Sequence, residues 1–456
     1  MLSPEFYRKF GIYGGGLFFT ITGMAQPFFT LYAQEVGAST AAIGLMVTLR
    51  SVLPIFIAMP VGQLIDSVGP IRMLKYGSAF LILSLFTNMI ADSLWMLSLS
   101  QVFMGTCVII MASSFQVLVS EGQKNERNEN IKKYSMWMSG GGMLGPLIGG
   151  AVTSLFANEL FGYKFTFGAA CVMSVLFFIL LLATARGYIR ENSAEAVDPR
   201  ELLKLKGITD SYMSGIGLMK IRSVQFGLIG TFLIMYIQAL YMSFMPIYLD
   251  QLGFATMAIS IIISIKGLAG MLSRYGLSWI MKKTHMERIL LIAGLVAAIC
   301  VVLTPLAGLH IAGIVLLALV MGAAVGINLP VSIMIVVNDT KDSDRGKIMG
   351  LRLIMNRFSQ ILSPAMFGLL GQLFGLTAAF YSGGAFLVAT MLGFAGYTSA
   401  RWKLRTSGSE RGGGGGLQGG AAPEEAAPDG LTTDPPERTA PGAAVGEGKA
   451  AAAALK

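Results

Sequence analysis

Arg50 is a charged residue inside an apolar run that begins at Thr40 and ends in a turn rich in glycine and charge, residues 62–75. At 1.5 Å per residue of helix, Arg50 lies about 15 Å from Thr40 and about 24 Å from Asp66, which places it near the middle of a bilayer. A charge at that depth costs about 2.5–3.5 kcal/mol and by default marks a functional site. The guanidinium of an arginine presents a planar fork of donors that suits a carboxylate or a phosphate.

Two further cations occupy comparable depths in other apolar runs. Lys266 lies as far into a second run as Arg50 lies into the first, and Arg357 lies about 15 Å into a third. Arg352 is nearer the end of that third run, and we expect its long side chain to reach the cytoplasmic surface. Three unpaired cations near one depth would together cost about 8–10 kcal/mol, so we expect them to be compensated.

Carboxylates do not provide that compensation inside the apolar runs. The acids at the ends of the runs include Glu35, Asp66, Glu121, Asp250 and Asp339. Cations without acids predict a central cavity that binds an anion, with Arg50, Lys266 and Arg357 as its ligands. Polar and aromatic residues at related depths are predicted to line the same cavity: Gln26, Gln238, Tyr241 and Asn356. The alternative is that the cations bond to backbone carbonyls, aromatic rings or water.

The sequence lacks the groups that other mechanisms use. Proton-driven carriers commonly need a carboxylate or a histidine within the membrane, and the two histidines, His285 and His310, lie at the edges of loops. We therefore favour exchange of anions, or a proton carried by the substrate itself. The three cysteines lie isolated in apolar runs, and neither a P-loop nor a set of metal ligands occurs. We expect no cofactor, no metal and no enzymatic activity.

The composition is that of a polytopic membrane protein. Of 456 residues, 54% are hydrophobic and 13% are charged, whereas soluble domains carry about 25% charged residues. Most of twelve apolar runs are long enough to cross about 30 Å of hydrocarbon as a helix. They cover residues 11–34, 40–64, 71–91, 94–118, 134–156, 165–186, 224–248, 256–280, 288–307, 309–337, 348–373 and 376–400. The predicted fold is an all-α bundle of twelve transmembrane helices, and the net charge of +9 needs no nucleic-acid partner.

The distribution of lysine and arginine predicts the orientation of the chain. Basic residues cluster before the first run and after each even-numbered run, while the other loops carry Lys164 and almost no others. Because cytoplasmic loops are enriched in lysine and arginine, both termini are predicted to be cytoplasmic, in an inner or plasma membrane.

The two halves of the chain repeat each other. With a shift of 216 residues, Gly37 falls on Gly253 and Arg50 falls on Lys266, and a shift near 218 aligns the later runs in the same way. Parallel six-helix repeats are a known transporter plan. The tail is rich in glycine, alanine and proline and is predicted to be disordered. The predicted parts are two halves, a cytoplasmic linker and a cytoplasmic tail: residues 1–186, 223–405, 187–222 and 406–456.

The turn after the second run reads Gly62-Gln-Leu-Ile-Asp66-Ser-Val-Gly69-Pro-Ile-Arg72. It resembles the G-x3-D-x2-G-x-[RK]-[RK] motif of the major facilitator superfamily, although Ser67 stands where the family has a basic residue. Glycine at positions 62 and 69 suits close packing and a turn. The resemblance covers all twelve runs and implies two pseudo-symmetric halves, alternating access and a small-molecule substrate. We also expect a monomer in the lipid bilayer.

Charged residues around this turn are candidates for a gate. In the family such a cluster fastens the halves on the cytoplasmic side, and the resemblance implies that Asp66, Arg72 and Glu121 stabilise the outward-facing state. Arg288 and Asp339 occupy the corresponding places in the second half. The alternative is a solvated loop with ordinary cytoplasmic charges.

The fifth run carries closely spaced glycines around a proline: Gly141, Gly145, Pro146, Gly149 and Gly150. This stretch resembles the G-x3-G-P-x2-G-G element of drug:proton antiporters in the same superfamily, which implies an exporter and a conformational role for these residues. Glycines four residues apart also let helices approach closely, so a packing seam is the alternative. Gln101 stands where such antiporters tend to have arginine, which argues against their coupling scheme here.

These observations favour a secondary active transporter that moves a small organic or phosphorylated anion by exchange or by symport coupled to the substrate. A drug or siderophore-like efflux antiporter is the first alternative. A non-transporting membrane receptor or scaffold is the second.

Overall fold

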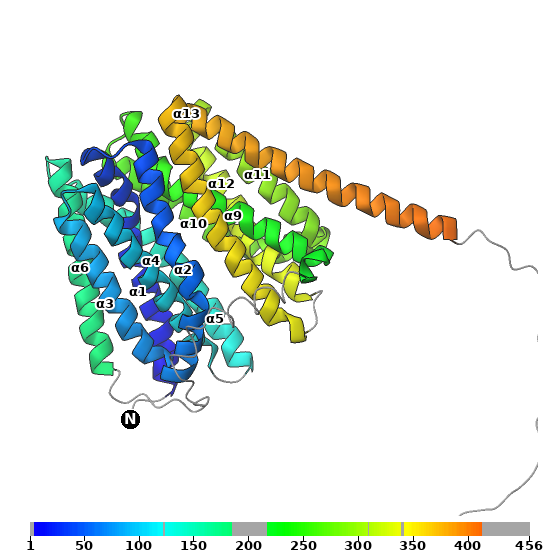
Figure 1. Ribbon diagram of the computed structural model, residues 1–456, viewed down its shortest axis with the longest axis horizontal. Helices are drawn as coiled ribbons and strands as arrows, with labels where there is room; N and C mark the ends of the chain where they lie inside the picture. The colour runs from blue at the N-terminus through cyan, green and yellow to red at the C-terminus, as the bar shows by residue number, and fades with distance from the viewer. Residues whose placement is uncertain (1–3, 122–123, 185–216, 309, 339–341, 413–456) are drawn as a thin grey trace, which may run out of the picture. The chain divides into compact units, whose positions relative to one another are not determined.

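The computed structural model describes residues 4–121, 124–184, 217–308, 310–338 and 342–412, and every regular element in these ranges is a helix (Figure 1). The first group is α1 (Pro4–Glu35), α2 (Thr40–Val68), α3 (Pro70–Ile90), α4 (Leu94–Ser120), α5 (Lys124–Thr153) and α6 (Glu159–Thr184). The second is a short 3-10 helix (Gly217–Lys220), α9 (Arg222–Gln251), α10 (Thr256–Lys283), α11 (Met286–Ala307), α12 (Ile311–Asn338) and α13 (Asp342–Gly412). In Figure 1 the first group runs from blue to green-cyan, and the second runs from green through yellow to the orange end of α13.

Most of these helices are long and apolar enough to cross a membrane. Nine segments of the described residues meet that requirement, in α2, α3, α4, α6 and α9–α13. The segment in α13 is 49 residues long and bends at Gly375, where φ is +82°, so its length suffices for two crossings. Two other helices, α1 and α5, have 32 and 30 residues but contain more glycine and polar residues. The count of twelve crossings therefore remains a prediction.

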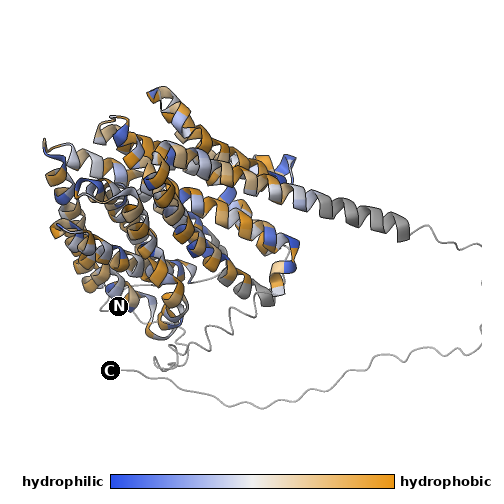
Figure 2. Ribbon diagram, turned by 45° about the horizontal axis from the view of Figure 1, so that its top comes forward, coloured by the Kyte–Doolittle hydropathy of each residue, from blue (hydrophilic) through white to orange (hydrophobic). Residues whose placement is uncertain are grey.

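The outer surfaces of the helices are apolar. Trp95, Leu176 and Leu316 expose 81%, 61% and 63% of their surface. Hydrophobic residues predominate along the helices in Figure 2. Apolar exposure on this scale is unfavourable in water and suits contact with lipid chains.

The sequence predicts a loop between the runs 94–118 and 134–156, at residues 121–133, and this prediction is wrong over most of that length. Residues from Lys124 onward form the first turns of α5, about ten residues before the predicted start of that run. Lys133 pairs with Glu129, four residues earlier, at 2.6 Å, and pairs at this spacing support a helix. At the other end of the chain, α13 continues to Gly412, past the predicted start of the tail. Residues 185–216 and 413–456, which hold most of the predicted linker and tail, lie outside the described residues.

The sequence repeat is visible in the backbone. Gly37 and Gly253 have φ of +90° and +80°, a conformation that glycine adopts readily. Each glycine lies in the turn before the second helix of its half. The side chains of Gln34 and Asp250, which are 216 residues apart, bond to each other at 3.2 Å. The two halves therefore meet near their pseudo-two-fold axis at this end of the bundle, which we call the Gly37/Gly253 end.

The halves also meet at two equivalent helix crossings. At the α2–α13 crossing, Gly44 lies so close to α13 that a Cβ atom would overlap the carbonyl of Pro364. At the α5–α10 crossing, a Cβ atom on Gly150 would overlap the side chain of Ser260. Ser264 further joins α10 to α5 by donating to the carbonyl of Met143 at 2.8 Å. Small residues thus allow the close approach of helices from opposite halves.

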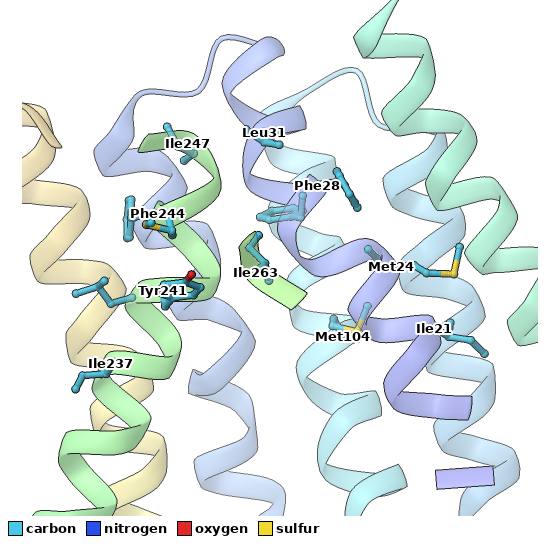
Figure 3. Close-up of a cluster of buried hydrophobic side chains, with 14 of the residues drawn as sticks. Ile21, Met24, Phe28, Leu31, Met104, Ile237, Tyr241, Phe244, Ile247 and Ile263 are labelled. Atoms are coloured by element: carbon cyan, nitrogen blue, oxygen red, sulfur yellow. The ribbon is translucent and has the colours of Figure 1, made fainter. Parts of the chain in front are cut away.

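Buried aromatic and aliphatic side chains of α1, α4, α9 and α10 belong to one cluster (Figure 3). Phe28 on α1 and Phe244 on α9 are fully buried, and Ile263 of α10 joins the same cluster. Tyr241 of α9 belongs to this cluster, and among the labelled side chains only Tyr241 carries an oxygen atom (Figure 3). This cluster extends along α9 to Ile237, next to Gln238 of the site described below.

The orientation of the chain is open to a direct test. We expect a reporter fused within the α5–α6 turn, at residues 154–158, and one fused at the C-terminus to report opposite sides of the membrane. A reporter enzyme active only in the cytoplasm and one active only outside it would make the measurement. Reports from the same side would contradict the predicted topology.

Candidate substrate-binding cavity

A cavity of about 220 Å³ lies between α5, α9, α10 and α12. Its charged and hydrogen-bonding side chains are Ser139, Gln238, Lys266 and Arg274. Five glycines and several apolar residues form the rest of its wall, and its described lining residues include no carboxylate. We call this space the Lys266 cavity. Its wall is apolar with a net positive charge, which is suited to an anion with an apolar or neutral body.

Lys266 is the centre of the polar contacts in this cavity. It is only 4% exposed, and its Nζ donates to Oε1 of Gln238 at 2.9 Å. The same Nζ lies 4.1 Å from the centre of the Tyr241 ring, a cation–π distance. The structure therefore brings together three residues that the sequence placed at related depths. A neutral amide and a ring face offset only part of the cost of burying a cation.

A glycine on a neighbouring helix packs against the backbone of each basic residue. A Cβ atom on Gly322 of α12 would overlap the carbonyl oxygen of Lys266, and one on Gly105 of α4 would overlap the carbonyl oxygen of Arg50. These pairs correspond in the repeat, so each half packs the backbone of its basic residue against a glycine. Both basic residues lie ten positions from the start of their helices.

Arg50 and Arg357 do not line the Lys266 cavity. Both have a buried Nε atom without a hydrogen-bond partner among the described residues. They lie near the α2–α13 crossing, where Ser51 donates to Gln360 at 3.4 Å. Asn356, one turn before Gln360 on α13, bonds to it. The described lining of the cavity also does not contain Gln26, Tyr241 or Asn356. Six of the seven predicted ligands therefore fall into two groups, one around Lys266 and one near the α2–α13 crossing. Gln26, half-buried on α1, belongs to neither group among the described contacts.

Arg274 is a cavity residue that the sequence reasoning missed. Its Nη1 donates to Ser139 at 3.0 Å and to Ser135 at 3.3 Å, both on α5. Its Nε is buried and has no partner among the described residues. The sequence did contain a signal for Arg274, because it is a charged residue inside the predicted run 256–280, at a depth different from that of Lys266.

Arg352 has a structural role instead of reaching the surface. It is 8% exposed and lies between three helices of the second half. Its Nε donates to Thr231 of α9 and one Nη atom donates to Ser332 of α12, both at 3.0 Å. The expectation that its charge reaches the cytoplasmic surface is wrong because hydroxyl groups solvate the guanidinium inside the half.

The candidate gate is only partly described. Gly69 has φ of +94° and begins α3, as expected for a turn glycine. A Cβ atom on Gly62 would meet no atom of the described residues within 4 Å, so these residues do not provide the close packing expected there. Arg72 and Arg288 are exposed, and Glu121 caps the end of α4. The side chains of Asp66 and Asp339 lie outside the described residues, and the gate remains a prediction.

The glycines of α5 have two different contacts. Cβ atoms on Gly141, Gly145 and Gly149 would each overlap the backbone of α1, and the one on Gly149 would also overlap the Phe28 ring. Pro146 also lies against α1, beside Gly23. Gly150 instead faces α10 of the opposite half, as described above. Most of this stretch is therefore a seam within one half, the α1–α5 seam, and its last residue takes part in the crossing between halves.

Comparison with known proteins agrees with this architecture. A family model described as Major Facilitator Superfamily matches residues 12–311. The chain is 23% identical over 278 residues to a staphylopine export protein of Staphylococcus aureus, covering 57% of this chain and 62% of that protein. It is 26% identical over 280 residues to a multi-drug resistance efflux pump PmrA homolog of Lactococcus lactis, covering 59% and 64%. The matched region thus spans less than two thirds of either relative.

Solved structures show the same fold. A bacterial homolog of the human lysosomal transporter Spinster, in an inward-facing and unoccupied conformation, superposes with a TM-score of 0.66. It is 16% identical and the match covers 85% of this chain and 94% of that one. An identity this low supports the fold and not the substrate. Because the family model matches more than half of the sequence, this chain belongs to the major facilitator superfamily, whose members are membrane transporters rather than enzymes.

Proposed function

We propose that this protein exports a small anionic molecule by alternating access. The observation that carries the proposal is the Lys266 cavity, where two cations face a space with no carboxylate among its described lining residues. A mobile anion is the simplest group to neutralise them, since an uncompensated cation in a low-dielectric interior is unfavourable. Export rather than import is supported by the names of both curated relatives.

The placement of acids supports coupling through the substrate rather than through the protein. Glu159 and Asp250 lie at the Gly37/Gly253 end, and Glu287 and His285 lie at the opposite end of the second half. No carboxylate or histidine of the described residues lies at the depth of Lys266. Exchange against another anion, or cotransport of a proton on the substrate, therefore fits the structure better than a proton relay in the bundle.

Efflux of uncharged or cationic drugs is the second candidate. Met235, Met242 and Met271 line the cavity, and methionine adapts its shape to different apolar ligands. The name of the Lactococcus lactis relative also favours this function. The two candidates differ in the charge of the ligand that the cavity should accept.

A ligand screen separates them. In lipid nanodiscs, we expect organic monocarboxylates and phosphate monoesters to raise the melting temperature of the purified protein. Quaternary ammonium compounds of similar size should leave it unchanged, because Lys266 and Arg274 repel a cation. Stabilisation by the cations and not by the anions would overturn the anion proposal in favour of drug efflux.

A further inference from the structure

The Lys266 cavity holds its two cations at different depths. Lys266 and Arg274 are eight residues apart on α10, which corresponds to about 12 Å along the helix axis. Both line the same cavity. One small anionic group cannot contact both cations at that separation unless the side chains fold towards each other, which their present bonds to different helices oppose.

Among the described residues, the hydrogen bonds of Arg274 come from one nitrogen of its guanidinium and leave the Nε–Nη2 edge without a partner. Both hydrogen bonds to the α5 serines come from Nη1. The Nε atom is buried without a partner among the described residues, and no bond from Nη2 is seen among them. The Nε–Nη2 edge is a pair of parallel donors, which matches the two oxygens of a carboxylate. The serines hold the planar group in place, so little side-chain freedom is lost on binding.

Lys266 also retains binding capacity. An ammonium group has three donors, of which one bonds to Gln238 and the ring of Tyr241 covers another direction. No further partner of Nζ is seen among the described residues, so the remaining donor can meet an anion. The ammonium is a compact charge without the fork of an arginine, so this end of the cavity selects for charge more than for shape.

The wall between the two cations is neutral. It consists mainly of glycines and apolar side chains, including Gly270, Met271 and Gly326. Gly270 and Gly326 also bring α10 and α12 into backbone contact, so the wall is rigid at this point. A ligand that bridges the cations therefore needs a neutral segment between its charged groups.

We propose that the substrate carries two anionic groups joined by a neutral segment, one at Lys266 and the other, a carboxylate, on the Nε–Nη2 edge of Arg274. This inference rests on the proposed function, because it names the class of anion that the same cavity takes. It also explains why Arg274 is fixed by two serines while one of its edges remains free.

Dicarboxylates of graded length provide the test. Isothermal titration of the full chain in nanodiscs should show that suberate binds at least about 10-fold more tightly than octanoate, which has the same length but one carboxylate. Succinate, which is too short to bridge the cations, should bind no better than octanoate. Arg274→Gln should reduce the affinity for suberate to that for octanoate, and Arg274→Lys should restore part of the difference.

The control is Lys132→Gln, which removes one exposed positive charge from the start of α5 and should change neither affinity. Ser139→Ala keeps the charge of Arg274 but removes one of the hydrogen bonds that position its guanidinium. It should therefore reduce the ratio of suberate affinity to octanoate affinity, and it provides a test if the Arg274→Gln protein does not fold. Binding of octanoate with no preference for suberate would overturn this inference and leave the proposed function standing. Binding of neither acid would overturn both.

Discussion

Lys266→Gln is expected to weaken anion binding by about 10- to 150-fold, the range for loss of one charged hydrogen bond worth about 1.5–3 kcal/mol. Lys266 is 4% exposed and its Nζ contacts Gln238 and the Tyr241 ring, so water screens its charge only weakly. Glutamine at this position can still bond to Gln238 but offers no charge to a ligand. Titration of a monocarboxylate into nanodiscs that contain the variant measures the effect.

The empty variant should be more stable than the empty wild-type protein. The wild-type protein buries a cation against a neutral amide, and removing that charge recovers up to about 2.5–3.5 kcal/mol, the insertion cost of a charge at this depth. A rise in melting temperature without ligand, together with a loss of stabilisation by ligand, is the combined signature that we expect. Lys132→Gln, on the surface, should show neither change.

Arg50→Gln is the companion measurement, because the repeat pairs Arg50 with Lys266 across the two halves. If both residues bind the same anion in some step of transport, both substitutions should weaken binding. An effect of Lys266→Gln alone would restrict the ligand to the Lys266 cavity. Unchanged affinity in both folded variants would return these cations to a structural role and favour drug efflux.

The sequence predicted the helices and their repeat well because these depend on local patterns. Apolar runs of bilayer length locate most helices, and Gly37 and Gly253 mark equivalent turns because few other residues adopt a positive φ. The early start of α5 was missed because its first turns are charged, and hydropathy cannot distinguish a charged helix from a loop. The Glu129–Lys133 pair at helical spacing was the signal for it.

The candidate site could be predicted only in part, because the sequence gives the depth of a residue along its helix but not the direction in which its side chain points. Counting residues along a helix gave the depth of Lys266, Gln238 and Tyr241, and these three do meet. It could not give the direction of Arg50 or Arg357, which depends on how each helix is rotated against its neighbours. Arg274 was missed for the same reason, since its place in the cavity follows from two serines of α5 that are remote in sequence.

Gly145→Ala is expected to destabilise the protein by about 1–3 kcal/mol, the usual cost of overpacking a well-packed contact. A Cβ atom at Gly145 would overlap the carbonyl oxygen of Thr20 and the backbone of Gly23 on α1. Both neighbours are backbone groups of a helix, so they cannot move aside as a flexible side chain could. The α1–α5 seam must therefore open along its length. Thermal unfolding in nanodiscs, followed through the accessibility of the buried Cys107, measures the change.

Gly140→Ala is the matched control on the same helix. A Cβ atom there would meet no atom of the described residues within 4 Å, so the substitution should stabilise α5 by about 0.5–1 kcal/mol through its better helix propensity. The two substitutions add the same methyl group at positions five residues apart. Because only Gly145 contacts α1, we expect Gly145→Ala to lower the stability of the protein and Gly140→Ala to raise it. Equal effects of both would show that the α1–α5 seam does not require glycine and would favour a conformational role for the glycines of α5 over a packing role.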